Sequence, residues 1–378
     1  MSNTAKWLIA IIVVIIIVCI LYFGLGQKAQ APISGEIKVG VILPLTGTSA
    51  DNGNNIKNGL LLAQSEINAS SSVKINLIFE DSQYKSEEAV KAVEKLINLD
   101  KVKYIIGDYG SSQTLAIAPI TEKNKVLLLT PGAQTNAISK AGDYVFRVHP
   151  SVRNETTYFV PEITRLSGKA KVGVLALNTD MGKDYSADFS EIYKKLGGQV
   201  GLIQMFEAKD SDYKTMLLKY KNEGIENLLF VGNRKMSGMV MRQIVELKLP
   251  FKVYMALVVK GEEYLSVAGK AGEGIIFPNN KVGGNNLLKN FETLYQKNYG
   301  AKPGFPSIVG YDALKLLSFC LSNNGDNVEK VKSCLYKVNG QEAGTIRSDL
   351  SFDQNGDLVN PQFELETVQN GQFVPLGQ

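Results

Sequence analysis

Short apolar segments and amphipathic segments alternate along this chain, and the alternation occurs twice. One series begins at Ile37 and a second at Val172, and each opens with Lys-Val-Gly-Val, at 38–41 and 171–174. Runs such as 37–43 are apolar throughout, whereas the segments between them place apolar residues at helical spacing. This alternation is typical of a parallel sheet with helices on both faces.

We therefore expect an α/β protein with two doubly wound, parallel-sheet lobes. The chain that follows the apolar head, which is the uncharged segment between Lys6 and Lys28, is also long enough for two domains. Open sheets of this kind bind ligands outside the carboxyl ends of their strands. Two such sheets can turn those ends toward one another across a cleft, which is where we expect the functional site.

The segment between Lys6 and Lys28 has no charge and consists mainly of Ile, Val and Leu. It is long enough to cross a bilayer as a helix, and we interpret it as an uncleaved membrane anchor. A cleaved signal peptide is the alternative, but the candidate cleavage site at 29–31 is followed directly by Pro32. We expect a single-pass cell-membrane protein whose residues after about position 30 lie on the extracytoplasmic side.

The residues that many enzymes need are absent from the sequence. His149 is the only histidine, and there is no G-x-S-x-G elbow, phosphate-binding loop or dinucleotide fingerprint. Cysteine and histidine are too sparse for a metal cluster. The formal net charge is +4 with no basic run, which does not favour nucleic-acid binding. We expect no catalysis, no cofactor and no metal.

Two polar turns follow neighbouring apolar segments and favour a binding site. The run 107–114 ends a predicted strand and opens a helix, where Ser111 and Ser112 add hydroxyls to the free backbone N–H groups. Helix amino termini of this kind attract carboxylates, although a serine there can also simply cap the helix. The run 130–135 forms the second polar turn at the same predicted sheet edge.

Cys320 and Cys334 are the only cysteines after the apolar head. They fall on two predicted helices, 307–323 and 327–338, which a short turn joins into a hairpin. We interpret them as a disulfide in an oxidising compartment. Two separate buried thiols remain the alternative.

From residue 36 to the carboxyl end, the chain resembles the leucine/isoleucine/valine-binding proteins. The similar motifs keep the same order and spacing, and they are 37–41 with 44–47, 66–68, 80–82, 105–107 with 111–114, 130–133, 144–147, 269–274 and 310–313. The resemblance implies a type I periplasmic-binding fold, in which two lobes are joined by three chain crossings and hold a small ligand between them. It also implies delivery of that ligand to the permease of an ABC transporter.

The implied crossings fall near 150–151, 277–279 and 352–358. We therefore expect an anchor and linker at 1–35, a first lobe of 36–151 plus 279–352, and a second lobe of 152–278 plus 353–378.

The resemblance can be carried to individual ligand-binding positions. The serine that holds the amino acid's carboxylate matches Ser111, and a backbone contact matches Gly132. Other family positions are changed in this chain: a threonine becomes Gln134 and two tyrosines become Met181 and Asn233. The full set of expected ligand-binding residues is Asn52, Tyr109, Ser111, Ser112, Gly132, Gln134, Met181, Asn233 and Val258.

Val258 is the most informative departure, because the family has there the glutamate that pairs with the ligand's ammonium. A buried ammonium without a countercharge is very costly. Glu262 or Glu263 could replace it if the alignment slips by a few residues. Otherwise the ligand is a carboxylate, an amide or another small polar solute without an ammonium group.

The function expected from these observations is a solute receptor that feeds an ABC transporter. A ligand-sensing ectodomain that signals to a membrane partner is the alternative, since the fold also serves signalling receptors. Only a few residues precede the apolar head, which leaves no room there for an output domain and favours transport.

Overall fold

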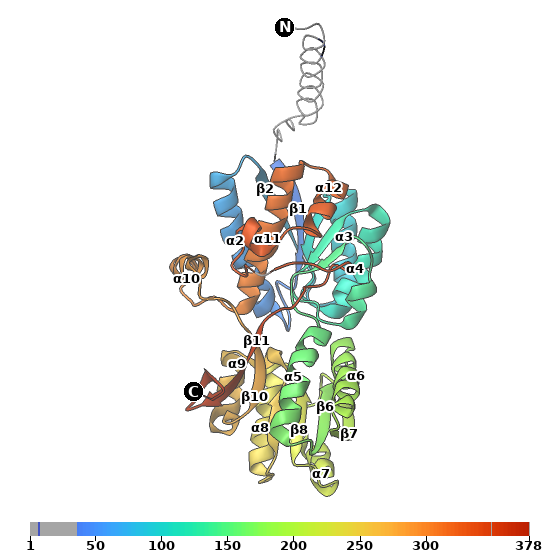
Figure 1. Cartoon of the computed structure of the whole chain (residues 1–378), viewed down its shortest axis with the longest axis vertical. Coiled ribbons are helices and arrows are strands. Elements are labelled where there is room, and N and C mark those ends of the chain that lie inside the picture. The colour runs from blue at the N-terminus through green and yellow to red at the C-terminus, as the bar shows by residue number, and fades with distance from the viewer. Residues whose placement is uncertain (1–6, 8–35, 349, 378) are drawn as a thin grey trace.

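The computed structural model describes residue 7, residues 36–348 and residues 350–377. These residues form two lobes, each built on its own sheet (Figure 1). Within the described ranges, no helix combines the length and the apolar character needed to span a bilayer. The predicted anchor at 1–35 lies outside the described residues, apart from Trp7.

The first sheet is wholly parallel and has the strand order β2-β1-β3-β4-β5. Its strands are β1 (Glu36–Leu43), β2 (Lys74–Asp81), β3 (Tyr104–Gly107), β4 (Leu127–Thr130) and β5 (Val145–Arg147). One face packs on α2 (Ala50–Ser70) and α11 (Phe305–Asn324), and the other on α3 (Ser86–Asn98) and α4 (Ser111–Asn124).

Two glycines allow α2 and α11 to approach closely. A Cβ atom on Gly59 would lie 1.9 Å from the Ser307 carbonyl oxygen, and one on Gly310 would lie 2.4 Å from that of Ile56. Any larger side chain would push the helices apart, so the 310–313 motif has a packing role here.

The second sheet has the order β12-β11-β10-β9-β8-β6-β7. Its strands are β6 (Lys171–Leu177), β7 (Gln199–Phe206), β8 (Asn227–Val231), β9 (Lys252–Met255), β10 (Ile276–Asn280), β11 (Phe363–Gln369) and β12 (Gln372–Pro375). Strands β6 to β10 pair in parallel, as predicted. The sheet is nevertheless mixed, because β11 pairs antiparallel with both β10 and β12.

Helices cover both faces of the second sheet as well. One face packs on α5 (Val152–Ser167) and α6 (Asp180–Lys195). The other packs on α7 (Lys214–Asn222), α8 (Arg234–Glu246) and α9 (Glu262–Ala268). Helix α10 (Asn286–Tyr299) and the short helices α12 (Val328–Leu335) and α13 (Gly340–Ala343) lie between β10 and β11 in the sequence, and α10 contacts α2 of the first lobe.

The chain connects the two sheets three times: between β5 and α5, between β10 and α10, and at 359–362 before β11. Residues 353–358 were predicted to belong to the second lobe. They lie instead against the first sheet, where the backbone N–H of Arg147 donates to the Gly356 carbonyl over 2.8 Å. Phe352, which precedes this segment, and Leu358 form an isolated antiparallel β-bridge. The reason is Asp357, whose carboxylate binds the buried Arg147 side chain.

A disulfide joins Cys320 on α11 to Cys334 on α12, with a Cα–Cα distance of 5.6 Å. Cys320 is completely buried in the first lobe, so the bridge fixes α12 to the core. The helical hairpin inferred from the sequence is thus present and covalently closed.

We predict that Cys334→Ser lowers the free energy of unfolding by about 3 kcal/mol, because the 14-residue separation sets a loop-closure entropy of that order. Urea unfolding followed by circular dichroism measures the change. The native protein under reducing conditions should lose the same amount, and the variant should not respond to reductant. Equal stability of the native protein with and without reductant would contradict this role.

Candidate functional site

The carboxyl ends of the two sheets meet at a surface that we call the inter-lobe face. On one side of it, the Ser112 hydroxyl, after β3, donates to the Asp180 carboxylate at the start of α6 over 3.1 Å. The Thr135 hydroxyl and the Asn136 N–H, after β4, both donate to Asp184 over 2.5 and 2.7 Å. The turns that the sequence singled out therefore contact the second lobe.

On another side of the inter-lobe face, Arg234 of the second lobe contacts the first lobe. It is the first residue of α8, directly after β8, and its Nη1 donates to Asn52 Oδ1 in the first lobe over 3.2 Å. Its Nε donates to the Lys260 carbonyl over 2.8 Å. The guanidinium also acts on Tyr109. Burial raises the pKa of Tyr109, and the positive charge of Arg234 offsets part of that rise. Asn52, Tyr109 and Arg234 are thus brought together.

Ser111 is positioned as a hydrogen-bond donor. Its hydroxyl oxygen accepts the N–H groups of Gln134 and Thr135 over 3.1 and 3.2 Å. A hydroxyl has two lone pairs and one proton, so its remaining capacity is to donate. Ser111 is also the first residue of α4. Among the described residues no side chain caps this helix, so the N–H groups of its first turn are available as well.

Gln134, whose backbone N–H donates to Ser111, also has a side-chain donor. Its side chain is 5% exposed, and its Nε2 is among the buried polar atoms that have no partner in the described part of the chain. A buried unpaired amide is costly, so a ligand oxygen is the natural partner. Gly132 lies in the same cluster, because a Cβ atom there would be 2.3 Å from the Tyr109 ring.

Two of the predicted ligand-binding residues in the second lobe are apolar. Met181 and Val258 are both half-buried and pack on the same hydrophobic cluster of that lobe. Asn233 is exposed and caps α8 by accepting the Met236 N–H over 2.9 Å. Glu262 and Glu263, the predicted substitutes for a countercharge, are both exposed at the start of α9.

Comparison with known proteins shows the family of this chain. The family model described as "Periplasmic binding protein" matches residues 36–369. The chain belongs to the periplasmic binding protein family.

This periplasmic binding protein is 24% identical over 364 residues to Leu/Ile/Val-binding protein homolog 3 of Brucella melitensis, covering 93% of this chain and 96% of the relative. Among solved structures, it is similar to the leucine-binding protein LivK of Thermotoga maritima, with a TM-score of 0.83, 25% identity and coverage of 90% and 97%. A solute-binding protein of an ABC transporter from Rhodopseudomonas palustris, in complex with 3,4-dihydroxybenzoic acid, has a TM-score of 0.79 at 23% identity, with coverage of 89% and 95%.

Glu155, in the first turn of α5 of this periplasmic binding protein, was not predicted from the sequence. Its carboxyl is 2% exposed and accepts the Leu257 N–H over 2.9 Å and the Tyr185 hydroxyl over 2.8 Å. Burial raises the pKa of Glu155 to about 7, and the two hydrogen bonds, which lower this pKa, offset only part of the rise. Glu155 therefore holds the 257–259 turn, which carries Val258, in place. In the sequence it reads only as an acidic residue in a first helical turn.

We predict that Glu155→Gln changes how stability depends on pH. The pKa of Glu155 is about 7 in the folded protein against an ordinary value of 4.5, so the folded state keeps a proton that the unfolded state loses between these values. Native stability should therefore fall as the pH rises through this interval, by about 3 kcal/mol in total. Glutamine keeps an acceptor oxygen but does not titrate.

Urea unfolding at pH values from 5 to 8 tests this. The variant should match the native protein at the acidic end and exceed it in stability at pH 8. Glu226→Gln, the same change at an exposed position of the second lobe, is the control and should leave the native pH profile intact. A native profile with no fall between pH 5 and 8 would contradict the assignment.

Proposed function

We propose that this protein is a membrane-tethered, extracytoplasmic receptor that captures a small carboxylate without an ammonium group between its lobes and delivers it to an ABC transporter. The main support for a carboxylate ligand is the set of hydrogen-bond donors at the inter-lobe face. Ser111 and the first turn of α4 offer hydrogens at this face, and Gln134, whose backbone N–H donates to Ser111, has an unpaired side-chain donor. Charge-assisted hydrogen bonds to a carboxylate are the strongest use of such donors.

The proposed absence of an ammonium rests on the groups of the second lobe. Its carboxylates at the inter-lobe face, Asp180 and Asp184, already accept hydrogen bonds from the first lobe. Val258 stands where the resembled family has its glutamate, and Glu262 and Glu263 are exposed. The charged side chain that bridges the lobes near Tyr109 is a cation, Arg234. An ammonium placed beside Arg234 without a carboxylate would be strongly disfavoured.

The named relatives support both parts of this proposal. Leucine-binding proteins support the transport role, and the dihydroxybenzoate complex is an instance of this fold with a carboxylate ligand that has no ammonium. The membrane tether rests on the uncharged segment between Lys6 and Lys28, which has the length of a bilayer span.

Matched ligand pairs test the selectivity of the purified full-length protein in detergent. Leucine with 4-methylpentanoate, phenylglycine with phenylacetate and glutamate with glutarate each differ by the ammonium group alone. Isothermal titration calorimetry should give at least roughly tenfold tighter binding of the deaminated member of the preferred pair, and Val258→Glu should reduce or reverse that preference. Tight binding of a free amino acid, abolished by Glu155→Gln, would contradict the proposal.

For the preferred carboxylate, we predict that Ser111→Ala weakens binding by roughly 10- to 100-fold. A hydrogen bond to a charged group contributes about 1.5–3 kcal/mol, and the substitution removes the hydroxyl proton. Ser70→Ala, in which an exposed serine at the end of α2 is changed in the same lobe, is the control. Unchanged affinity in Ser111→Ala would show that the carboxylate binds elsewhere.

A further inference from the structure

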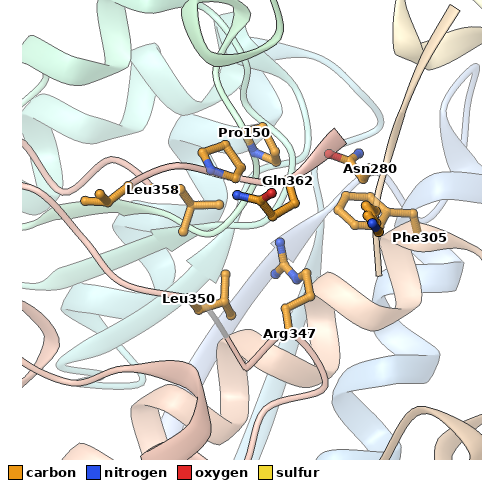
Figure 2. Close-up of a pocket in the computed structure, with 10 residues that line it drawn as sticks. Pro150, Asn280, Phe305, Arg347, Leu350, Leu358 and Gln362 are labelled. Carbon is orange, nitrogen blue, oxygen red and sulfur yellow. The ribbon is translucent and has the colours of Figure 1, made fainter. Parts of the chain in front are cut away.

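A small cavity lies where the three connections between the lobes come together (Figure 2). Each connection contributes to its lining: Pro150 from the first, Asn280 and Lys281 from the second, and Gln362 from the third. Its volume is about 20 Å³, which is room for one particle the size of a water molecule or a chloride ion. It is separate from the inter-lobe face, since it contains none of the residues assigned to the carboxylate.

Arg347 is the central polar group of this cavity. Its side chain is 7% exposed, and Figure 2 shows the guanidinium extending toward Gln362. Nε donates to Asp312 over 2.8 Å and Nη1 donates to the Val148 carbonyl over 3.0 Å. Nη2 has no hydrogen-bond partner among the described residues. A buried guanidinium nitrogen without a partner is costly, so it marks a place for an acceptor.

The charges around the cavity select the kind of acceptor. Both charged lining residues, Arg347 and Lys281, are cations. The buried Asp312 carboxylate neutralises only one of them. His149 packs edge-on against Phe305, and burial lowers its pKa to about 4, so it is neutral. A water molecule would satisfy Nη2. A monovalent anion would satisfy it too and would also be attracted by the exposed Lys281 at the mouth of the cavity.

We propose that this cavity is a binding site for a chloride-sized monovalent anion, held by Arg347 Nη2 and Lys281. The amides of Asn280 and Gln362 complete the lining. Gln362 Nε2 donates one hydrogen to the Asn360 carbonyl over 2.9 Å and has a second for such an ion. Because the lining combines the first lobe with all three connections, a bound anion links the segments that set the lobe orientation. The cavity is too small for an organic carboxylate, which distinguishes it from the proposed ligand site.

Bromide is the direct probe, because its anomalous scattering distinguishes it from water. Crystals of the full-length protein soaked in bromide should show an anomalous peak within hydrogen-bond distance of Arg347 Nη2. An ordered water at that position, with no anomalous signal, would overturn the proposal.

A solution experiment makes the test independent of crystals. At constant ionic strength, replacing methanesulfonate by chloride should raise the melting temperature, because the anion binds the folded state. Ser111→Ala should keep this shift, which separates it from ligand binding at the inter-lobe face. Arg347→Lys, which keeps a charge near Asp312 but removes Nη2, should abolish it. Equal melting temperatures in the two salts would overturn the proposal.

Arg347→Lys can fail to fold because Asp312 is buried, so a second pair of variants completes the test. Lys281→Gln removes a charge at the exposed mouth of the cavity and should weaken the apparent chloride affinity several-fold. Lys289→Gln, the same change at an exposed position on α10, should leave that affinity unchanged. Equal effects of the two substitutions would show that the chloride response comes from the overall charge of the protein, and would contradict a specific site.

Discussion

The buried guanidinium of Arg147 connects the parts on which the site depends. It is completely buried, and its Nη1 donates to the carbonyls of Gln134 and Thr135 over 3.1 and 2.7 Å. Its other nitrogens donate to Asp357 and Ser139. One side chain thus fixes the turn after β4, the end of β5 and the segment that leads into the third connection. Removing one partner of such a buried pair typically costs about 3–5 kcal/mol. The position of Ser111 follows from this, because its hydroxyl is oriented by the N–H groups of the same turn.

The inter-lobe face divides its chemistry between the lobes. The first lobe offers hydrogen-bond donors. The second lobe offers the apolar surface of Met181 and Val258, and its Asp180 and Asp184 carboxylates accept hydrogen bonds from the first lobe. Burial keeps the pKa of Glu155 near 7, so this carboxyl is a weak countercharge at neutral pH and mainly supports the backbone at Leu257. This division agrees with a ligand that has one anionic end and an uncharged body.

The sequence predicts local features of this fold well, because periodicity and turn chemistry are local. The strands at 36–43 and 171–177, the polar turns after β3 and β4 and the helical hairpin with its two cysteines all follow from short windows. The antiparallel pairing of β11 with β10 does not, since the alternation of side chains gives no direction of pairing. Glu155 and Arg347 were missed for a related reason. Their partners Leu257 and Asp312 are 102 and 35 residues away, and no local pattern marks either as buried.

A crystal structure of the full-length protein with its preferred carboxylate tests the proposed ligand site most directly. We expect the ligand's carboxylate within hydrogen-bond distance of Ser111 Oγ and the first N–H groups of α4, with Val258 against its uncharged body. A ligand whose carboxylate lies away from α4, or whose ammonium is paired with a carboxylate of the second lobe, would contradict it.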